Sequence, residues 1–204
     1  MQKINPNTTV LLFFDMLNGH IKTDNPVTQA RFKDVIPNAV GLLAAARKHQ
    51  MMVAYAHANH RDDNGTTAST IRDRDNYQNP LREDHVEQRI FGGGTWESSV
   101  IDELAPQPED YLIPKYRWNA FFQTYLELAL RTRGIDTIVL CGGSTDVGVA
   151  STAYMARDLD YNIIFASDAC SSHQMDCHEF LMDRVFPRMG RVRTSAEILE
   201  MFPA

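Results

Sequence analysis

Three short segments of the sequence place chemically useful residues directly after apolar runs. Asp15 follows the run 9–14, Lys115 follows the run 111–113, and a glycine-rich turn at 142–148 follows the run 137–140. A carboxylic acid and an ammonium group that meet at one place can transfer a proton and stabilise charge that develops during a reaction. Asp15 and Lys115 are therefore candidate catalytic residues.

The third segment carries a glycine at a position where α/β hydrolytic enzymes often present a nucleophile. The stretch 138–153 predicts a buried strand, a tight turn at Gly142 and Gly143, and a helix that opens on small residues. The residue presented at this strand-to-helix corner is Gly148, which has no side chain and cannot attack a substrate. The sequence therefore predicts the fold more directly than the reaction.

Strand and helix patterns alternate along the chain, which is typical of right-handed βαβ units and a parallel sheet. Strands are expected at 9–14, 51–56, 111–113, 137–140, 161–166 and 191–193. Helices are expected at 36–50, from about 95–100, at 121–133 with Gly134 after its end, at 145–159, at 175–185 and after the capping box 194–197. The pattern predicts one α/β domain over residues 1–204, a three-layer Rossmann-like fold with a mainly parallel six-stranded sheet and helices on both faces. Sites in such folds lie outside the carboxyl ends of the strands.

The segment 59–96 is long, polar and poor in periodic apolar residues. A long insertion of this kind in a compact domain is more often a binding loop or lid than filler. Phe91 and Trp96, beside the glycines 92–94, form either part of a lid or a subunit contact. Specificity for the substrate is expected to reside in this loop.

The overall composition excludes several classes of protein. The 204 residues are 44% hydrophobic and 23% charged, with a net charge of −6 and no Lys/Arg run, which argues against a nucleic-acid partner. The apolar runs are too short to span a membrane, and the first residues lack a signal peptide. Three cysteines without a framework spacing indicate reduced thiols, so a cytoplasmic location is expected.

At the three segments the chain resembles the isochorismatase-like, or cysteine hydrolase, superfamily. Residues 13–18 match the Asp motif of that family, and residues 114–121 match its Lys motif, which reads K-x-R-x-S-A-F. Residues 142–148 match its G-x-x-T-x-x-C turn, with Gly148 in the cysteine position. The similarity extends over nearly the whole chain.

The resemblance implies two kinds of chemistry, and Gly148 separates them. In amidase members the Cys attacks a carbonyl, the Asp acts as its base, and the Lys supports the charged intermediate. Without a thiolate that covalent route is closed. The isochorismatase branch, which cleaves a vinyl ether, also has Gly there; Asp15 would protonate the enol carbon, and Lys115 would orient Asp15. A nearby ammonium favours the ionised carboxylate, so burial near Phe13 and Phe14 would have to offset it.

The resemblance also implies a cis peptide bond at Gly143–Ser144, whose amides form an oxyanion hole in the amidases. A plain tight turn explains the glycine pair equally well. Arg117 and Trp118 either contact a carboxylated or planar substrate or pack the start of a helix. The further candidates for substrate contact are Asn59, Phe14 and Trp96.

Neither a metal nor another cofactor is expected. The family members that bind zinc use an Asp-x-His pattern, which falls here on His57 and Asn59 and is broken. Cys141 ends a buried strand and is expected to be a core thiol. Cys170 and Cys177 are out of register with the catalytic position.

Three functions remain open from the sequence. The first is an isochorismatase-like hydrolase that acts on a small molecule without a covalent intermediate. The second is a catalytically silent relative that binds a small molecule or a partner. The third is an amide or ureide hydrolase whose cysteine has been replaced. A homo-oligomer, either a dimer or a tetramer, is expected in each case.

Overall fold

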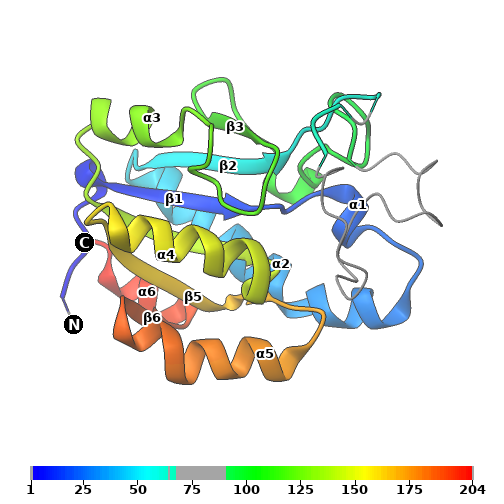
Figure 1. Ribbon diagram of the computed structural model, residues 1–204. Helices are drawn as coiled ribbons and strands as arrows, with labels where there is room; N and C mark the ends of the chain where they lie inside the picture. The colour runs from blue at the N-terminus through cyan, green and yellow to red at the C-terminus, as the bar shows by residue number, and fades with distance from the viewer. Residues whose placement is uncertain (1, 64, 68–90, 204) are drawn as a thin grey trace.

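A six-stranded parallel sheet forms the centre of the molecule (Figure 1). The computed structural model describes residues 2–63, 65–67 and 91–203. The strand order is β3-β2-β1-β4-β5-β6, and every neighbouring pair is parallel. The strands are β1 (Thr9–Phe14), β2 (Met52–Ala58), β3 (Tyr111–Lys115), β4 (Thr137–Gly143), β5 (Asn162–Ser171) and β6 (Arg191–Arg193). This confirms the predicted α/β fold, with a sheet that is entirely rather than mainly parallel.

Helices cover both faces of the sheet and complete three layers (Figure 1). In Figure 1, α2 and α6 lie behind the sheet, and α3 and α4 lie in front of it. The α-helices are α1 (Asn18–Ile21), α2 (Pro26–Lys48), α3 (Leu126–Thr132), α4 (Ala150–Asp158), α5 (Met175–Phe180) and α6 (Ser195–Met201). Shorter helical turns occupy Pro6–Thr8, Thr145–Val149, Asp102–Leu104, Leu181–Val185 and Phe186–Arg188. Within the described ranges, no helix combines the length and the apolar character needed to cross a bilayer.

The central strand β1 is buried along its whole length. All six of its residues are buried, because β2 and β4 flank its edges and helices cover both faces. The ring of Phe13 stacks on that of Tyr55 in β2, with 5.1 Å between ring centroids. The strand that carries Asp15 at its end is therefore held rigidly in the core.

Helix α2 begins ten residues earlier than predicted. The prediction of a start at 36 followed apolar periodicity alone and was wrong, because the helix has a strong start signal at Asn25 and Pro26. The Asn25 side chain accepts hydrogen bonds from the amides of Val27 (2.9 Å) and Thr28 (3.4 Å), and Pro26 occupies the first helical position. The longer helix brings Arg31 and Phe32 to the carboxyl ends of the strands.

Two other predicted helices need correction. Residues 95–100 form irregular turns rather than a helix, because the Ser98 hydroxyl and amide both bond back to Thr95. Helix α3 begins at Leu126 instead of 121, after a turn in which Thr124 donates its hydroxyl to the carbonyl of Ala120 (2.5 Å). The predicted end of this helix is confirmed, since Gly134 follows it with φ of +64°.

Strand β5 also runs further than expected. It was predicted to end at Ala166, but it continues to Ser171 after a register shift opposite Leu140 and Gly142 of β4. Pairing resumes between Gly143 and Ser171. The bulge therefore carries a polar segment to the same edge of the sheet as Asp15.

The end of β4 requires a glycine. Gly142 has φ of +118°, and a Cβ atom there would lie 2.1 Å from the carbonyl oxygen of Phe14. We expect Gly142→Ala to lower the free energy of unfolding by about 1–3 kcal/mol or more, because it combines backbone strain with a collision against the backbone of β1. Urea denaturation measures this change.

The matched control is Gly41→Ala in α2, where an added Cβ meets no atom within 4 Å. This variant is expected to raise the free energy of unfolding by about 0.5–1 kcal/mol, since alanine favours the helix. Equal effects of the two substitutions would contradict the account of the β4 corner.

Candidate active site

A cavity of about 430 Å³ opens at the carboxyl ends of the central strands. Phe14 and Asp15 reach it from the end of β1, Lys115 from β3, Gly143 from the end of β4 and Gly148 from the turn that follows. Parallel strands place their carboxyl ends along one edge of a sheet, so residues far apart in sequence converge here. The sequence-predicted catalytic residues therefore share one cavity.

Asp15 and Lys115 form a nearly buried ion pair in this cavity. The Lys115 ammonium lies 2.6 Å from Oδ2 of Asp15, and the side chains are 6% and 11% exposed respectively. The other carboxylate oxygen, Oδ1, accepts a hydrogen bond from the amide of Ala58 at 3.0 Å. Since Ala58 pairs in register with Lys115, the sheet itself fixes both partners of the carboxylate. The orientation of the Asp15 carboxyl group is set from both sides.

The backbone of Asp15 also adopts an unusual conformation. Its φ is +46°, in the left-handed region that few non-glycine residues adopt. Its amide donates to the carbonyl of Ala56 at 2.9 Å, which continues the β1–β2 pairing by one residue. The chain therefore turns sharply at the residue that carries the carboxylate, as is common where function holds a residue in place.

The ring of Phe14 supports the other side of Lys115. The ammonium nitrogen lies 4.5 Å from the centroid of this ring, within the range of a cation–π interaction. Lys115 therefore lies between a carboxylate and an aromatic face, and both contacts come from consecutive residues of the chain. This arrangement leaves the ammonium little freedom to move.

The same ring occupies the space in front of Gly148. A Cβ atom at residue 148 would lie 2.0 Å from Cε1 and 2.2 Å from Cζ of Phe14. Such distances are far below van der Waals contact, so no side chain fits at residue 148 while the ring stays in place. Phe14 therefore fills the position into which a nucleophile would point.

The turn after β4 contains the cis peptide bond between Gly143 and Ser144 that the resemblance implied. Both residues line the cavity. The Ser144 hydroxyl donates to the carboxylate of Asp146, and Ser172 donates to Oδ1 of Asp146 at 2.7 Å. Ser172 also accepts from the amide of Asp146 at 3.2 Å, so these side chains tie the turn to the end of β5.

Of the predicted substrate contacts, Phe14 and Trp118 line the cavity and three residues do not. Trp118 lies at its rim and is 54% exposed. Arg117 is directed elsewhere, because its guanidinium donates to the carbonyls of Thr66 (2.7 Å) and Tyr116 (2.5 Å). Trp96 is 58% exposed and lies outside the cavity lining.

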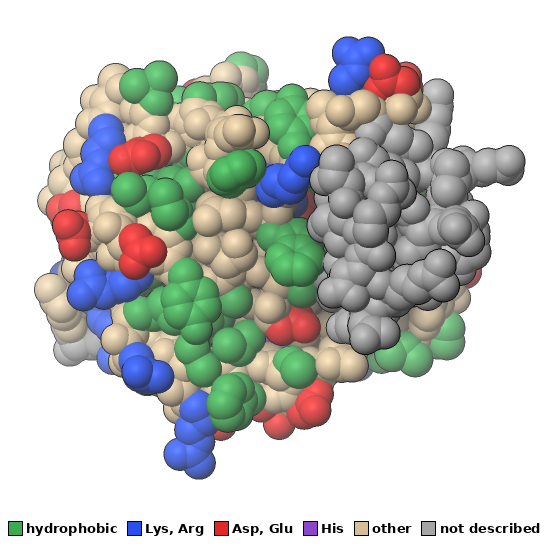
Figure 2. All heavy atoms as spheres, viewed as in Figure 1, with side chains coloured by type: hydrophobic (Ala, Val, Ile, Leu, Met, Phe, Trp, Pro, Cys, Tyr) green, Lys and Arg blue, Asp and Glu red, His purple; other side chains and the backbone are tan. Residues whose placement is uncertain are grey.

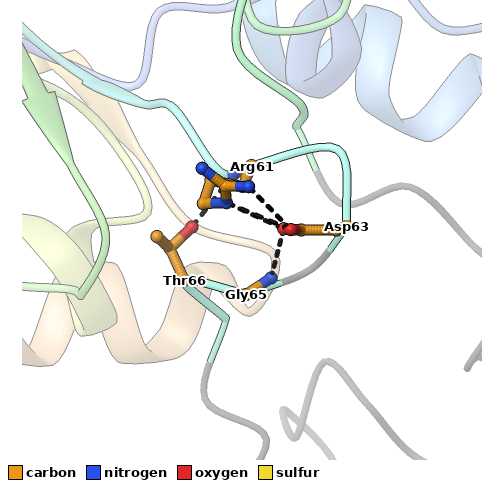
Figure 3. A network of polar contacts seen from close by, with 4 residues as sticks. All are labelled: Arg61, Asp63, Gly65 and Thr66. Atoms are coloured by element: carbon orange, nitrogen blue, oxygen red, sulfur yellow. Dashed lines mark hydrogen bonds and ion pairs between the residues drawn. The ribbon is translucent and has the colours of Figure 1, made fainter.

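Asn59 lies in a separate, more open hollow beyond the end of β2, where its side chain packs against Gly93. The neighbouring turn is ordered by its own polar network (Figure 3). Asp63 pairs with Arg61 at 2.8 Å and accepts the amide of Gly65 at 2.9 Å. Asn59 is thus part of the wall of this hollow rather than of the Asp15 cavity.

Several cavity residues escaped the sequence analysis. They are His20, Arg31, Phe32, Asp146, Val147, Ser171, His173 and Gln174. The Asn25-Pro26 start of α2 would have placed Arg31 and Phe32, and the polar run after β5 would have indicated 171–174. His20 had no signal of its own. Burial lowers its pKa and favours the neutral imidazole, which contacts the Phe91 ring in a tilted arrangement with 4.1 Å between centroids.

The three cysteines, all of which the structure describes, do not line the cavity. Cys141 and Cys170 are buried, and burial raises the pKa of the Cys170 thiol to about 12 and that of Cys141 above its ordinary value. Cys177 lies on α5, where burial also raises its pKa. Within 2–63, 65–67 and 91–203, no group of three His, Cys, Asp or Glu side chains is arranged to hold a metal ion.

Comparison with known proteins decides the family. Residues 9–197 match the model of the isochorismatase domain. The chain belongs to the isochorismatase family. It is 36% identical over 196 residues to an isochorismatase family protein of Bacillus subtilis, covering 94% of this chain and 93% of that one.

Other members of the isochorismatase family support the same assignment. A ureidoacrylate amidohydrolase of Rhizobium rhizogenes is 31% identical over 175 residues, with 81% of this chain and 71% of that one covered. The solved structure of an isochorismatase family protein from Burkholderia thailandensis matches with a TM-score of 0.80 and 28% identity, covering 98% of each chain. This isochorismatase-family chain is therefore a hydrolase with the family's α/β fold.

The packing of Phe14 against Gly148 predicts how a side chain at residue 148 changes the free energy of unfolding. Gly148→Ala is expected to lower the free energy of unfolding by about 1–3 kcal/mol, because the added methyl group collides with the ring. In a Phe14→Leu background the same substitution is expected to cost less, with a coupling of about 0.5–3 kcal/mol between the two sites. Urea denaturation of the wild type, Gly148→Ala, Phe14→Leu and the double variant measures this coupling free energy.

Gly41→Ala, combined with Phe14→Leu, is the control pair, since Gly41 lies on α2 with open space around it. Its effect is expected to be independent of residue 14. A Gly148→Ala cost that is the same in both backgrounds would show that the ring does not occupy this space.

Proposed function

We propose that this protein hydrolyses a small molecule of the vinyl-ether type without forming a covalent intermediate, with Asp15 as the acid–base group. The observation that carries the proposal is the joint geometry of Asp15, Lys115, Phe14 and Gly148. The carboxylate and ammonium are in contact at 2.6 Å, and an aromatic ring fills the position of a nucleophile. The cavity supplies a proton-transfer group but no side chain at residue 148 that can attack.

The proposed reaction needs one proton and one water molecule. Protonated Asp15 transfers its proton to the terminal carbon of the vinyl ether, and the double-bond electrons form the new C–H bond. The resulting oxocarbenium ion takes up water at the ether-bearing carbon, and Asp15 recovers a proton from that water. The hemiketal then collapses to a ketone and an alcohol, so the reaction consumes only water.

Lys115 has two tasks in this proposal. Its hydrogen bond to Oδ2 orients the carboxyl group, and its charge stabilises the carboxylate that is left after proton transfer.

A second candidate is the hydrolysis of an amide or ureide, and the similarity to a ureidoacrylate amidohydrolase favours it. Without a thiol at residue 148, Asp15 would act as the base for direct attack by water on the carbonyl carbon. The amides of Gly143 and Ser144 would then be the oxyanion donors. A catalytically silent protein that binds a small molecule or a partner is the outcome if no substrate is turned over.

We also propose a cytoplasmic homo-oligomer that does not bind nucleic acid. The net charge of −6 and the three free thiols support these proposals. Exposed hydrophobic side chains on the face that carries α3 and α4 provide surface for contact between copies (Figure 2). Leu128 of α3 and Tyr154 of α4 are among the exposed hydrophobic residues.

A substrate panel tests the proposed reaction. Isochorismate and simpler vinyl ethers, amides and ureides are assayed with the wild-type protein and with Asp15→Asn. We expect turnover of a vinyl ether, and a fall in kcat of about 10²-fold to 10⁴-fold in Asp15→Asn, because the variant has no acid–base group.

The control is Asp34→Asn, an equivalent change at an exposed position of α2, which is expected to keep full activity. Circular dichroism checks that both variants fold. Turnover of amides or ureides alone would select the second candidate, and no turnover of any class would overturn both.

Insensitivity to thiol reagents provides an independent prediction. Because no cysteine lines the cavity and Cys141 and Cys170 are buried, iodoacetamide is expected to leave turnover unchanged. A variant with Cys177→Ser is expected to behave like the wild type. Stoichiometric inactivation by iodoacetamide, with substrate protecting, would show that a sulfur nucleophile takes part.

A further inference from the structure

Arg31 lines the cavity but makes no hydrogen bond or ion pair in the described part of the chain. Its Nε atom is buried and has no partner. A buried N–H group without a partner is destabilising, particularly when it belongs to a charged group. Nε itself is shielded, so a ligand in the cavity would bond to the two terminal nitrogens of the guanidinium, for which the described residues supply no acceptor. A charged group of this kind in a cavity wall indicates a binding role.

The guanidinium is held in place by apolar packing rather than by polar contacts. Its central carbon lies 4.8 Å from the centroid of the Phe32 ring, and Phe32 is itself only 5% exposed. Both residues belong to α2, which packs along the sheet. Arg31 is thus pre-positioned at the cavity, and a ligand does not need to displace an existing ion-pair partner.

Asp146 is the acidic residue whose charge acts on the Arg31 guanidinium. Burial lowers the pKa of the Arg31 guanidinium, and the charge of Asp146 offsets only part of this. The Asp146 carboxylate is already engaged by the hydroxyls of Ser144 and Ser172. Asp146 therefore compensates the charge of Arg31 in part without a hydrogen bond or ion pair to it among the described residues.

Lys115, the other cationic residue of the cavity lining, already has an ion-pair partner among the described residues, unlike Arg31. Lys115 is in contact with Asp15 at 2.6 Å and its charge is compensated by that carboxylate. Of these two cations, Arg31 is the one able to take up a further anion. A guanidinium binds a carboxylate through two parallel hydrogen bonds, which fix the orientation of the bound group as well as its charge.

We propose that Arg31 determines the specificity of this cavity by pairing with a carboxylate of the substrate. The carboxylate then lies on the side of the cavity formed by α2, by Ser171 at the end of β5 and by His173 and Gln174. The reacting group lies on the side of Asp15. The proposal names the substrate class of the function proposed above, and its kinetic test rests on that function.

His20 also lines the cavity. Burial lowers the pKa of His20 and favours its neutral imidazole, so this residue adds no third positive charge beside Lys115 and Arg31.

The binding test uses benzoate and benzamide, which share a ring and a size but differ in charge. Isothermal titration calorimetry compares them on the wild type, Arg31→Gln, Arg31→Lys and Lys33→Gln. We expect the wild type to bind benzoate at least about tenfold more tightly than benzamide, and Arg31→Gln to lose about 10-fold to 100-fold in benzoate affinity. Arg31→Lys is expected to keep part of the preference, because it keeps the charge without the two parallel donors.

Lys33→Gln is the matched control. It makes the same change in charge two residues along α2, at an exposed position that faces a different hollow. It is expected to bind benzoate like the wild type. Equal binding of benzoate and benzamide by the wild type, no benzoate binding at millimolar concentration, or equal losses in the Arg31 and Lys33 variants would overturn the proposal.

A kinetic comparison separates this proposal from the proposed reaction. With a carboxylate substrate that is turned over, Arg31→Gln is expected to raise KM by more than tenfold and to change kcat less, and the methyl ester is expected to show no such rise. If benzoate selectivity depends on Arg31 but nothing is turned over, only the proposed reaction fails. If turnover depends on Asp15 but Arg31→Gln does not alter KM, only the role of Arg31 fails.

Discussion

The contact between the Lys115 ammonium and the Asp15 carboxylate is the interaction on which the whole site depends. It joins the ends of two strands that β2 separates, and the amide of Ala58 in β2 completes the set of donors. Each side chain is nearly buried, so loss of either partner leaves an uncompensated charge in a poorly solvated place. The parallel sheet provides the rigidity that holds this pair, because β1 is buried on every side.

The ring of Phe14 lies between this ion pair and residue 148, the position at which relatives with a cysteine would carry their nucleophile. One residue both supports Lys115 and fills the space in front of Gly148. Residue 148 must therefore be a glycine while the ring is in this position, because any side chain there would collide with the ring. A single replacement by cysteine would not rebuild a thiol enzyme, because the ring would have to move first and Lys115 would lose its aromatic support.

The sequence predicted the strands, and the meeting of Asp15 with Lys115, well. Buried parallel strands form continuous apolar runs, so the residues at their ends can be located from the sequence. Asp15, Lys115 and Gly148 were placed together for this reason. Arg31 was missed because apolar periodicity alone gave a late start for α2, although Asn25 and Pro26 mark the true start. The polar residues after β5 were missed because a bulge extends that strand.

Side-chain direction was the part that the sequence could not supply. Arg117 stands two residues from Lys115 and matches a family motif, yet its guanidinium bonds to backbone carbonyls outside the cavity. Asn59 follows β2 directly, yet it packs against Gly93 in a separate hollow. Contacts of this kind depend on loops packed from distant parts of the chain, and no local spacing encodes them.

In the proposed reaction, the Asp15–Lys115 pair promotes addition of water to the substrate, and no bond forms between protein and substrate. Single-turnover reaction in ¹⁸O-labelled water, followed by mass spectrometry of product and intact protein, tests this most directly. We expect the label to enter the product and the mass of the protein to stay unchanged throughout. A covalent adduct on the protein, or labelled oxygen in the Asp15 carboxyl group, would contradict it.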